Sequence, residues 1–109
     1  MTVVAFVPGL MDRSRFDGLG VVFVSSGRRA LELAPTVIYV DLDRCPSPAE
    51  FRLDGAHVVG FAAHVDDERL EAGRAAGFDD VVPRSVFFRR LRDVVDHDDS
   101  QGTTKGDQQ

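Results

Sequence analysis

The residues best placed for chemistry are two aspartates behind a strand-like apolar run. Asp41 and Asp43 come directly after the run Val-Ile-Tyr-Val at residues 37–40. In a parallel sheet, ligands bind at the carboxyl ends of strands, where the strand order reverses. Asp41 is therefore the carboxylate nearest the crevice where a ligand would be expected, between the first and third strands.

His64 is a weaker candidate, although it also follows an apolar run and stands close to Asp66 and Asp67. One imidazole, with no second histidine or cysteine at ligand spacing, is too little for a transition-metal site. No glycine-rich loop leads from a strand into a helix, as a phosphate-binding loop would. We therefore predict no metal site, no cofactor and no catalytic residue.

The elements that must position Asp41 alternate along the chain. Apolar runs predict strands at residues 3–7, 21–24, 37–40, 58–62 and 81–82. Helical patterns lie between them, and alternation of this kind predicts a parallel sheet with right-handed crossovers. We expect an α/β fold with five strands in the order 2-1-3-4-5 and helices on both faces. One proline and three glycines between residues 8 and 20, Pro8, Gly9, Gly18 and Gly20, predict that the first helix is short or missing.

Local signals mark several helix ends. Ser47, Pro48 and Glu50 have the spacing of a capping box. Gly77 suits the left-handed residue that ends a helix begun by an acidic cluster. In the last helix we expect one inward stripe, made of Phe87, Leu91, Val94 and Val95.

Residues 56–95 carry motifs that point to a family. An apolar strand ends at Ala62 and Ala63, the turn Ala-Gly-Phe-Asp-Asp follows at residues 76–80, and Pro83 precedes the cation Arg84. This half of the chain resembles a response-regulator receiver domain, and we take residues 1–95 as one receiver-like domain. The resemblance implies that Asp41 occupies the phosphate-accepting position.

The same resemblance shows which working residues this chain has changed. Receivers hold Mg²⁺ with an acidic pair, which here falls at about Val7 and Pro8. The hydroxyl position is Ala62, the lysine position is Arg84, and the aromatic switch position is Val81. Asp12, a few residues beyond the expected acidic pair, is the one local substitute for a metal ligand. Asp41, Asp43, Ala62 and Arg84 thus make a vestigial site, in which Asp41 can also serve as a loop anchor and Asp43 as a turn residue.

The expected function is that of a stand-alone atypical receiver, not an enzyme, which acts by protein–protein interaction without phosphorylation. One alternative is a phosphate-accepting receiver with Asp41 as acceptor. Another is a flavodoxin-like module that binds a small molecule in the crevice beside Asp41. The partner is expected to be another protein or a second copy. We expect docking on the face of the last two helices and last strand, through Val81, Phe88, Arg89 and Arg92. Phe88 would then be partly exposed; the alternative is that it packs on the neighbouring helix beside Leu70 and Ala76.

Composition limits the other partners. Residues 96–109 hold four aspartates and one lysine, which gives −3 of the formal net charge of −5, and we expect them to form a disordered acidic tail. So little positive charge argues against a nucleic-acid surface. The chain has no apolar run of membrane-spanning length, and its only cysteine is Cys45. We therefore expect a cytoplasmic protein without a membrane partner.

Overall fold

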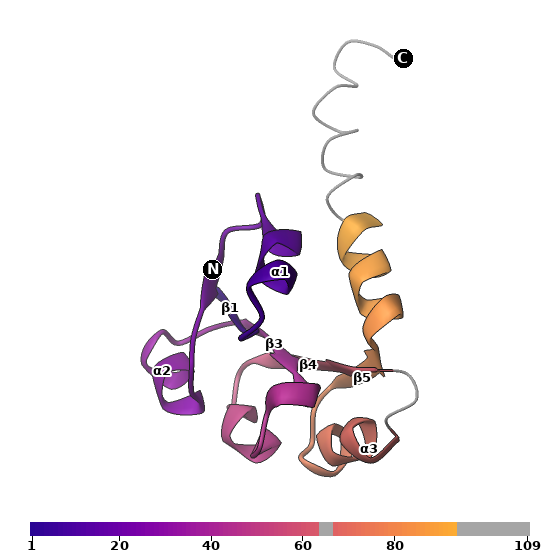
Figure 1. The fold of residues 1–109 in the computed structure, drawn as a ribbon. Coiled ribbons are helices and arrows are strands. Elements are labelled where there is room, and N and C mark those ends of the chain that lie inside the picture. The colour runs from indigo at the N-terminus through magenta and orange to yellow at the C-terminus, as the bar shows by residue number, and fades with distance from the viewer. Residues whose placement is uncertain (64–66, 94–109) are drawn as a thin grey trace.

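The computed structural model describes residues 1–63 and 67–93. Five strands form one parallel sheet in the order β2-β1-β3-β4-β5, which confirms the predicted α/β topology (Figure 1). The strands are β1 (Val3–Phe6), β2 (Val21–Phe23), β3 (Val37–Asp41), β4 (His57–Ala62) and β5 (Asp80–Pro83). The predicted tail and His64 lie outside the described residues.

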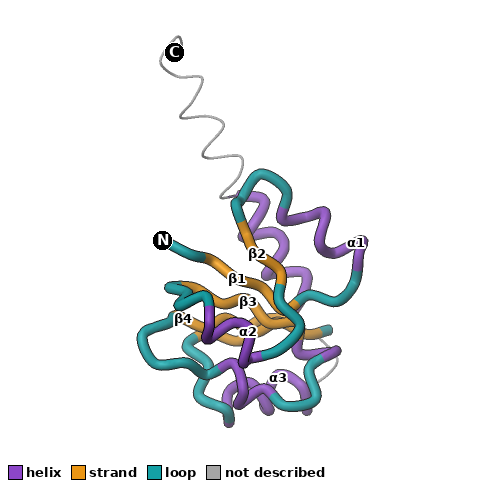
Figure 2. The backbone as a smooth tube through the Cα atoms, turned by 90° about the vertical axis from the view of Figure 1, so that its left-hand side faces the viewer, coloured by secondary structure: helices purple, strands orange, loops and turns teal. Residues whose placement is uncertain are grey.

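Helical segments cover both faces of the sheet (Figure 2). On one face lie α2 (Gly27–Glu32), α3 (Asp67–Ala75) and two short 3₁₀ turns, η2 (Leu42–Arg44) and η3 (Pro48–Phe51). On the other face lie α1 (Leu10–Arg13), the 3₁₀ turn η1 (Ser14–Phe16) and a helix over residues 84–93, drawn in orange in Figure 1. We call this the last helix. The first helix is short, as the proline and the glycines on either side of it predicted.

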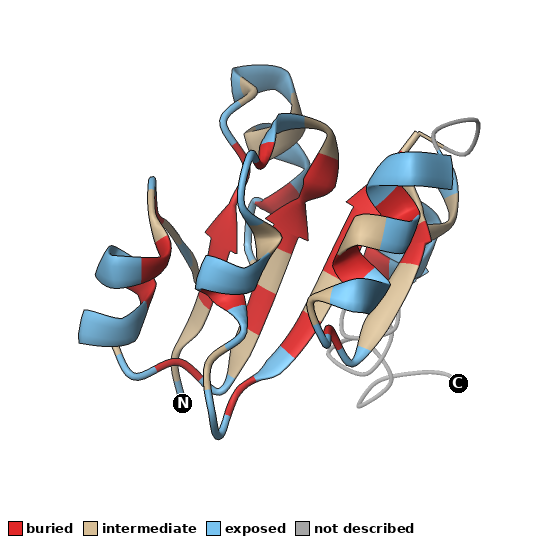
Figure 3. Cartoon of the chain, turned by 90° about the horizontal axis from the view of Figure 1, so that it is seen from below, coloured by how far each residue is buried: buried red, intermediate tan, exposed pale blue. Residues whose placement is uncertain are grey.

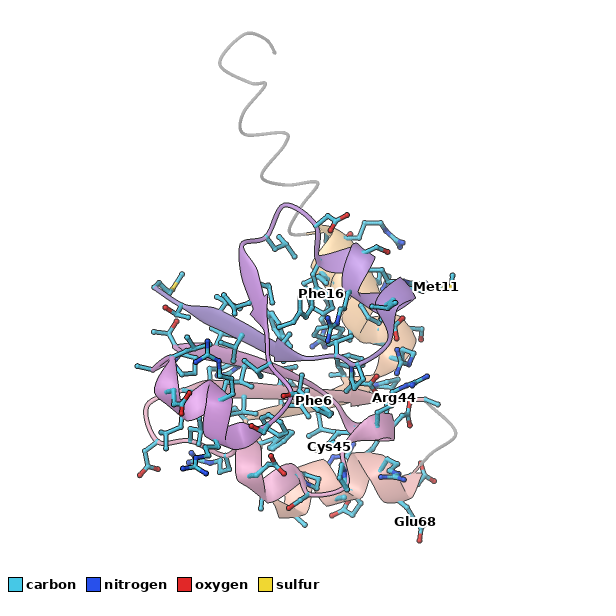
Figure 4. The ribbon with its side chains drawn as sticks, turned by 60° about the vertical axis from the view of Figure 1, so that its left-hand side comes forward. Phe6, Met11, Phe16, Arg44, Cys45 and Glu68 are labelled. Atoms are coloured by element: carbon cyan, nitrogen blue, oxygen red, sulfur yellow. The ribbon has the colours of Figure 1, made fainter. Side chains whose placement is uncertain are left out.

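Each face of the sheet has its own apolar core. The buried residues lie on the strands and on the sides of the helices that face them (Figure 3). The core under α2 and α3 contains Ile38, Val58 and Phe51, and Phe51 is only 1% exposed. Cys45 is also buried in this core (Figure 4), and burial raises the pKa of its thiol. The second core is mainly aromatic: Phe61 stacks on Phe87, with ring centroids 4.3 Å apart.

Two of the predicted helix-end signals have different outcomes. Gly77 has a φ of +90°, which glycine adopts without steric cost, so its prediction is confirmed. The capping box is wrong, because Ser47 accepts no capping hydrogen bond and the segment forms only η3. Glu50 instead accepts a hydrogen bond from the backbone N–H of Gly27, at 2.6 Å. This contact fixes the start of α2 against η3, so a tertiary contact uses the side chain that the local pattern assigned to a cap.

Phe88 is the main correction on the last helix. The docking prediction requires it to be partly exposed, but it is 5% exposed and packs in the second core, whereas Leu70 and Ala76 belong to the first. Its neighbour is Phe16 of η1, with ring centroids 5.8 Å apart, so η1 covers the side of the helix that we expected to face solvent. Phe87 and Leu91 point inward as predicted, and Val94 and Val95 lie outside the described residues.

None of the helices in the described part of the chain has the length and apolar character that crossing a bilayer requires.

The turn at Asp79 supplies a testable contact. The Asp79 backbone N–H donates to the Val58 carbonyl at 2.9 Å, and the Asp79 carboxylate accepts from the Val58 N–H at 2.8 Å. That backbone hydrogen bond is the main reason why the pKa of Asp79 lies below its usual value. A carboxylate with a lowered pKa stabilises the fold above its unfolded pKa of about 3.9, and the stabilisation is lost as the pH falls through the folded pKa.

Asp79→Ala should therefore lower Tm by several degrees at neutral pH, and the difference from the unmodified chain should shrink in acid. Thermal melts followed by circular dichroism at several pH values measure both effects. Asp80→Ala is the matched control, because Asp80 pairs at 3.1 Å with the exposed Arg90 and such surface pairs contribute little. Equal losses in the two variants at every pH would contradict the role given to Asp79.

Candidate functional site

Arg84 lies at the centre of the candidate site. It is the first residue of the last helix, and its guanidinium contacts three carboxylates from three separate segments. Nη1 donates to Asp12 of α1 at 2.7 Å. Nη2 donates to Asp41 at the end of β3 at 2.9 Å, and to Asp43 of η2 at 3.4 Å. The planar guanidinium can reach all three because its N–H groups form a rigid fork.

Asp41 is the most deeply buried member of this cluster, with an exposed fraction of 0%. Its Oδ1 accepts from Arg84 and also from the backbone N–H of Asp43 at 3.1 Å, which is the loop-anchor role foreseen for a strand-end carboxylate. Its Oδ2 is buried and has no hydrogen-bond donor among the described residues. Burial raises the pKa of Asp41, although the attraction and hydrogen bond of Arg84 act in the opposite direction.

Asp43 links two loops at the carboxyl edge of the sheet. Its Oδ2 accepts from the backbone N–H of Ala63, just after β4, at 2.9 Å, while Arg84 approaches the same oxygen. The sequence indicated only a turn residue here. The contact joins residues 20 positions apart, so no local pattern could reveal it.

Arg84 is also fixed by aromatic rings. Its guanidinium carbon lies 5.1 Å from the ring centroid of Phe61 and 5.9 Å from that of Phe88. Burial alone disfavours the charged guanidinium, but Asp41 and Asp12 together raise the pKa of Arg84 above its usual value. Arg84 therefore stays charged and supplies the cation of the site.

The structure brings Asp41, Asp43 and Arg84 together as predicted. Ala62 and Val7 are buried at 0% exposure, and neither side chain has an atom that can hold a metal or bond a phosphoryl group. Asp12 was considered as a metal ligand, but it pairs with Arg84 instead, 72 residues away in the chain. Within the described residues, no group of three or more histidine, cysteine or acidic side chains is arranged to hold a metal ion.

The residues expected to bind a partner are only partly at the surface. Arg89 and Arg92 are exposed, whereas Val81 is half-buried against the first core. Phe88 is buried, as described above. The exposed part of the expected face is therefore charged and not aromatic.

Two comparisons of the sequence with known proteins gave no match. No protein-family model matches the chain, and no curated protein sequence matches it significantly. The strand order of the sheet is that of a flavodoxin-like α/β fold, and the receiver resemblance of residues 56–95 stays a prediction.

The ion-pair cluster predicts that substitution of Arg84 lowers the stability of the fold. Arg84→Met leaves the buried carboxylate of Asp41 without a cation, and breaking such a pair costs about 3–5 kcal/mol. The free energy of unfolding, measured by urea denaturation, should fall by that amount. In an Asp41→Asn background the same substitution should cost much less, because the buried charge is already gone. Equal losses in the two backgrounds would contradict the coupling.

Proposed function

We propose that the protein is an atypical receiver-like signalling module that acts by binding another protein, or a second copy of itself, without phosphorylation of Asp41. The observation that carries this proposal is the closure of Asp41. Its carboxylate has no exposed surface, and the oxygen that is hydrogen-bonded is already bound by Arg84 and by a backbone N–H. A phosphoryl donor can reach Asp41 only if Arg84 moves away.

The side chains around Asp41 support the same proposal. Phosphoryl transfer to a carboxylate depends on cations that neutralise charge on the transferring group. Among the described residues, Arg84 is the one cation bonded to Asp41, and it already pairs with three carboxylates. Val7 and Ala62, at the positions of the metal-binding acid and the hydroxyl, offer only alkyl groups.

One observation favours a second candidate, a phosphate-accepting receiver. Asp12, Asp41 and Asp43 all pair with Arg84, so two further acidic side chains lie near the phosphate-accepting position, although the described residues form no group arranged to hold a metal ion. We rank this candidate second because Arg84 is fixed by Phe61 and Phe88 as well as by the carboxylates.

A direct test is incubation of the full chain with acetyl phosphate and Mg²⁺, followed by intact mass spectrometry. We expect no stable adduct in the unmodified chain, because Arg84 and burial close the Asp41 carboxylate. Asp41→Asn is the matched control. An adduct that forms in the unmodified chain and is absent from Asp41→Asn would establish the second candidate instead.

The interaction part of the proposal is tested by affinity capture. A partner that binds independently of phosphorylation should be retained equally by the unmodified chain and by Asp41→Asn. Binding should be lost in the Arg89→Glu and Arg92→Glu double variant, whose substitutions lie on exposed positions of the last helix. A partner lost with Asp41→Asn alone, in a variant that is still folded, would contradict the proposal.

A further inference from the structure

The α1–η1 segment and the last helix form a groove on one face of the sheet. Phe16 of η1 packs beside the last helix (Figure 4), and two cavities of about 330 and 340 Å³ lie next to this contact. Arg15 and Phe88 line both cavities, so the cavities adjoin. We call them together the Arg15 groove; its lining includes Arg15, Asp17, Arg84, Ser85, Phe88 and Arg92.

The Arg15 groove is rich in positive charge for a chain whose formal net charge is −5. Of the residues that the structure describes, three with guanidinium groups line it, against one carboxylate, that of Asp17. Arg84 is neutralised by its own aspartates. Arg15 and Arg92 form no ion pair with a carboxylate of the residues that the structure describes. Two cations therefore remain to attract an anion.

Arg15 contacts an aromatic ring, although it has no carboxylate partner in the described part of the chain. Its guanidinium carbon lies 4.7 Å from the ring centroid of Phe88. That ring is itself fixed, because it is 5% exposed and packs edge-on against Phe61 and Phe87. A cation ordered on an aromatic face loses less conformational entropy when it binds a ligand.

We propose that the Arg15 groove binds a small phosphate monoester, held by Arg15 and Arg92, which line the same cavity. The guanidinium fork matches the geometry of phosphate oxygens. A monoester carries about −1.5 to −2 charges at neutral pH, which balances the two unpaired guanidiniums, whereas a single carboxylate would not. The volume of each cavity lies at the lower end of the range for small-ligand sites, about 300 to 1,000 Å³.

This inference goes beyond the proposed function and does not depend on it. The ligand is bound noncovalently by Arg15 and Arg92, and Asp41 does not line the groove cavities. Failure of phosphate binding would leave the phosphorylation-independent module untouched. A phosphoryl adduct on Asp41 would bear on the proposed function alone, because phosphate binding in the groove does not involve Asp41.

The test is a titration of the ¹⁵N-labelled full chain with glycerol 2-phosphate, with sodium chloride at matched ionic strength as the control. We expect saturable shifts of the Arg15 and Arg92 Nε–H signals. Arg15→Gln and Arg92→Gln should each weaken binding about tenfold, as loss of a hydrogen bond to a charged group does. Arg89→Gln, on the same helix but outside the lining of the groove, should leave the phosphate affinity unchanged.

Three results would overturn the proposal. The first is a set of shifts that do not saturate, or that chloride reproduces, since this is ionic screening. The second is unchanged affinity in a folded Arg15→Gln and Arg92→Gln double variant. The third is a phosphoserine peptide that binds far more tightly than glycerol 2-phosphate, which would assign the groove to a protein ligand. If Arg15→Gln fails to fold, Arg92→Gln alone decides, because its side chain is exposed.

Discussion

The contacts of the Arg84 guanidinium are the interaction on which the carboxyl edge of the sheet depends. One side chain joins α1 through Asp12, β3 through Asp41 and η2 through Asp43. A fully buried carboxylate needs a cation, and Arg84 is the one bonded to Asp41 in the described residues. The site is thus closed by its own side chains, and Arg84 supplies the cation that pairs with the Asp41 carboxylate. Lysine at this position could not reproduce the fork that serves three acceptors.

The position of Arg84 depends in turn on the aromatic core. The last helix, which begins with Arg84, is anchored by Phe87, whose ring stacks on Phe61 of β4 with an interplanar angle of 11°. The same Phe61 ring lies under the Arg84 guanidinium at 5.1 Å. Packing of the last helix and closure of Asp41 are therefore coupled. A partner that moved the last helix would also move the cation that closes the site, which gives the proposed binding module a physical route from its surface to its interior.

The sequence predicted the sheet well, because buried parallel strands appear as short apolar runs and their order follows from the alternation with helices. It also predicted that Asp41 and Arg84 meet, through the receiver resemblance. It could not predict what depends on long-range packing. Phe88 lies one residue off the apolar stripe, and the docking prediction placed it at the surface. Phe16, in the glycine-containing segment between β1 and β2, covers it instead. Glu50 fitted a local cap, yet it bonds to Gly27, 23 residues away. Asp12 gave no local signal that it pairs with Arg84.

The most direct test of the account is a pH titration of the Asp41 side-chain carboxyl carbon by ¹³C nuclear magnetic resonance. Closure by burial predicts a midpoint above the ordinary aspartate value, since burial raises the pKa of Asp41 despite the neighbouring Arg84. A raised pKa means that the fold is favoured below the unfolded pKa of about 3.9 and loses this contribution as the pH rises through the folded pKa. Added Mg²⁺ should leave the midpoint unchanged. An ordinary midpoint that millimolar Mg²⁺ lowers further would show an open, metal-binding carboxylate and would contradict the account.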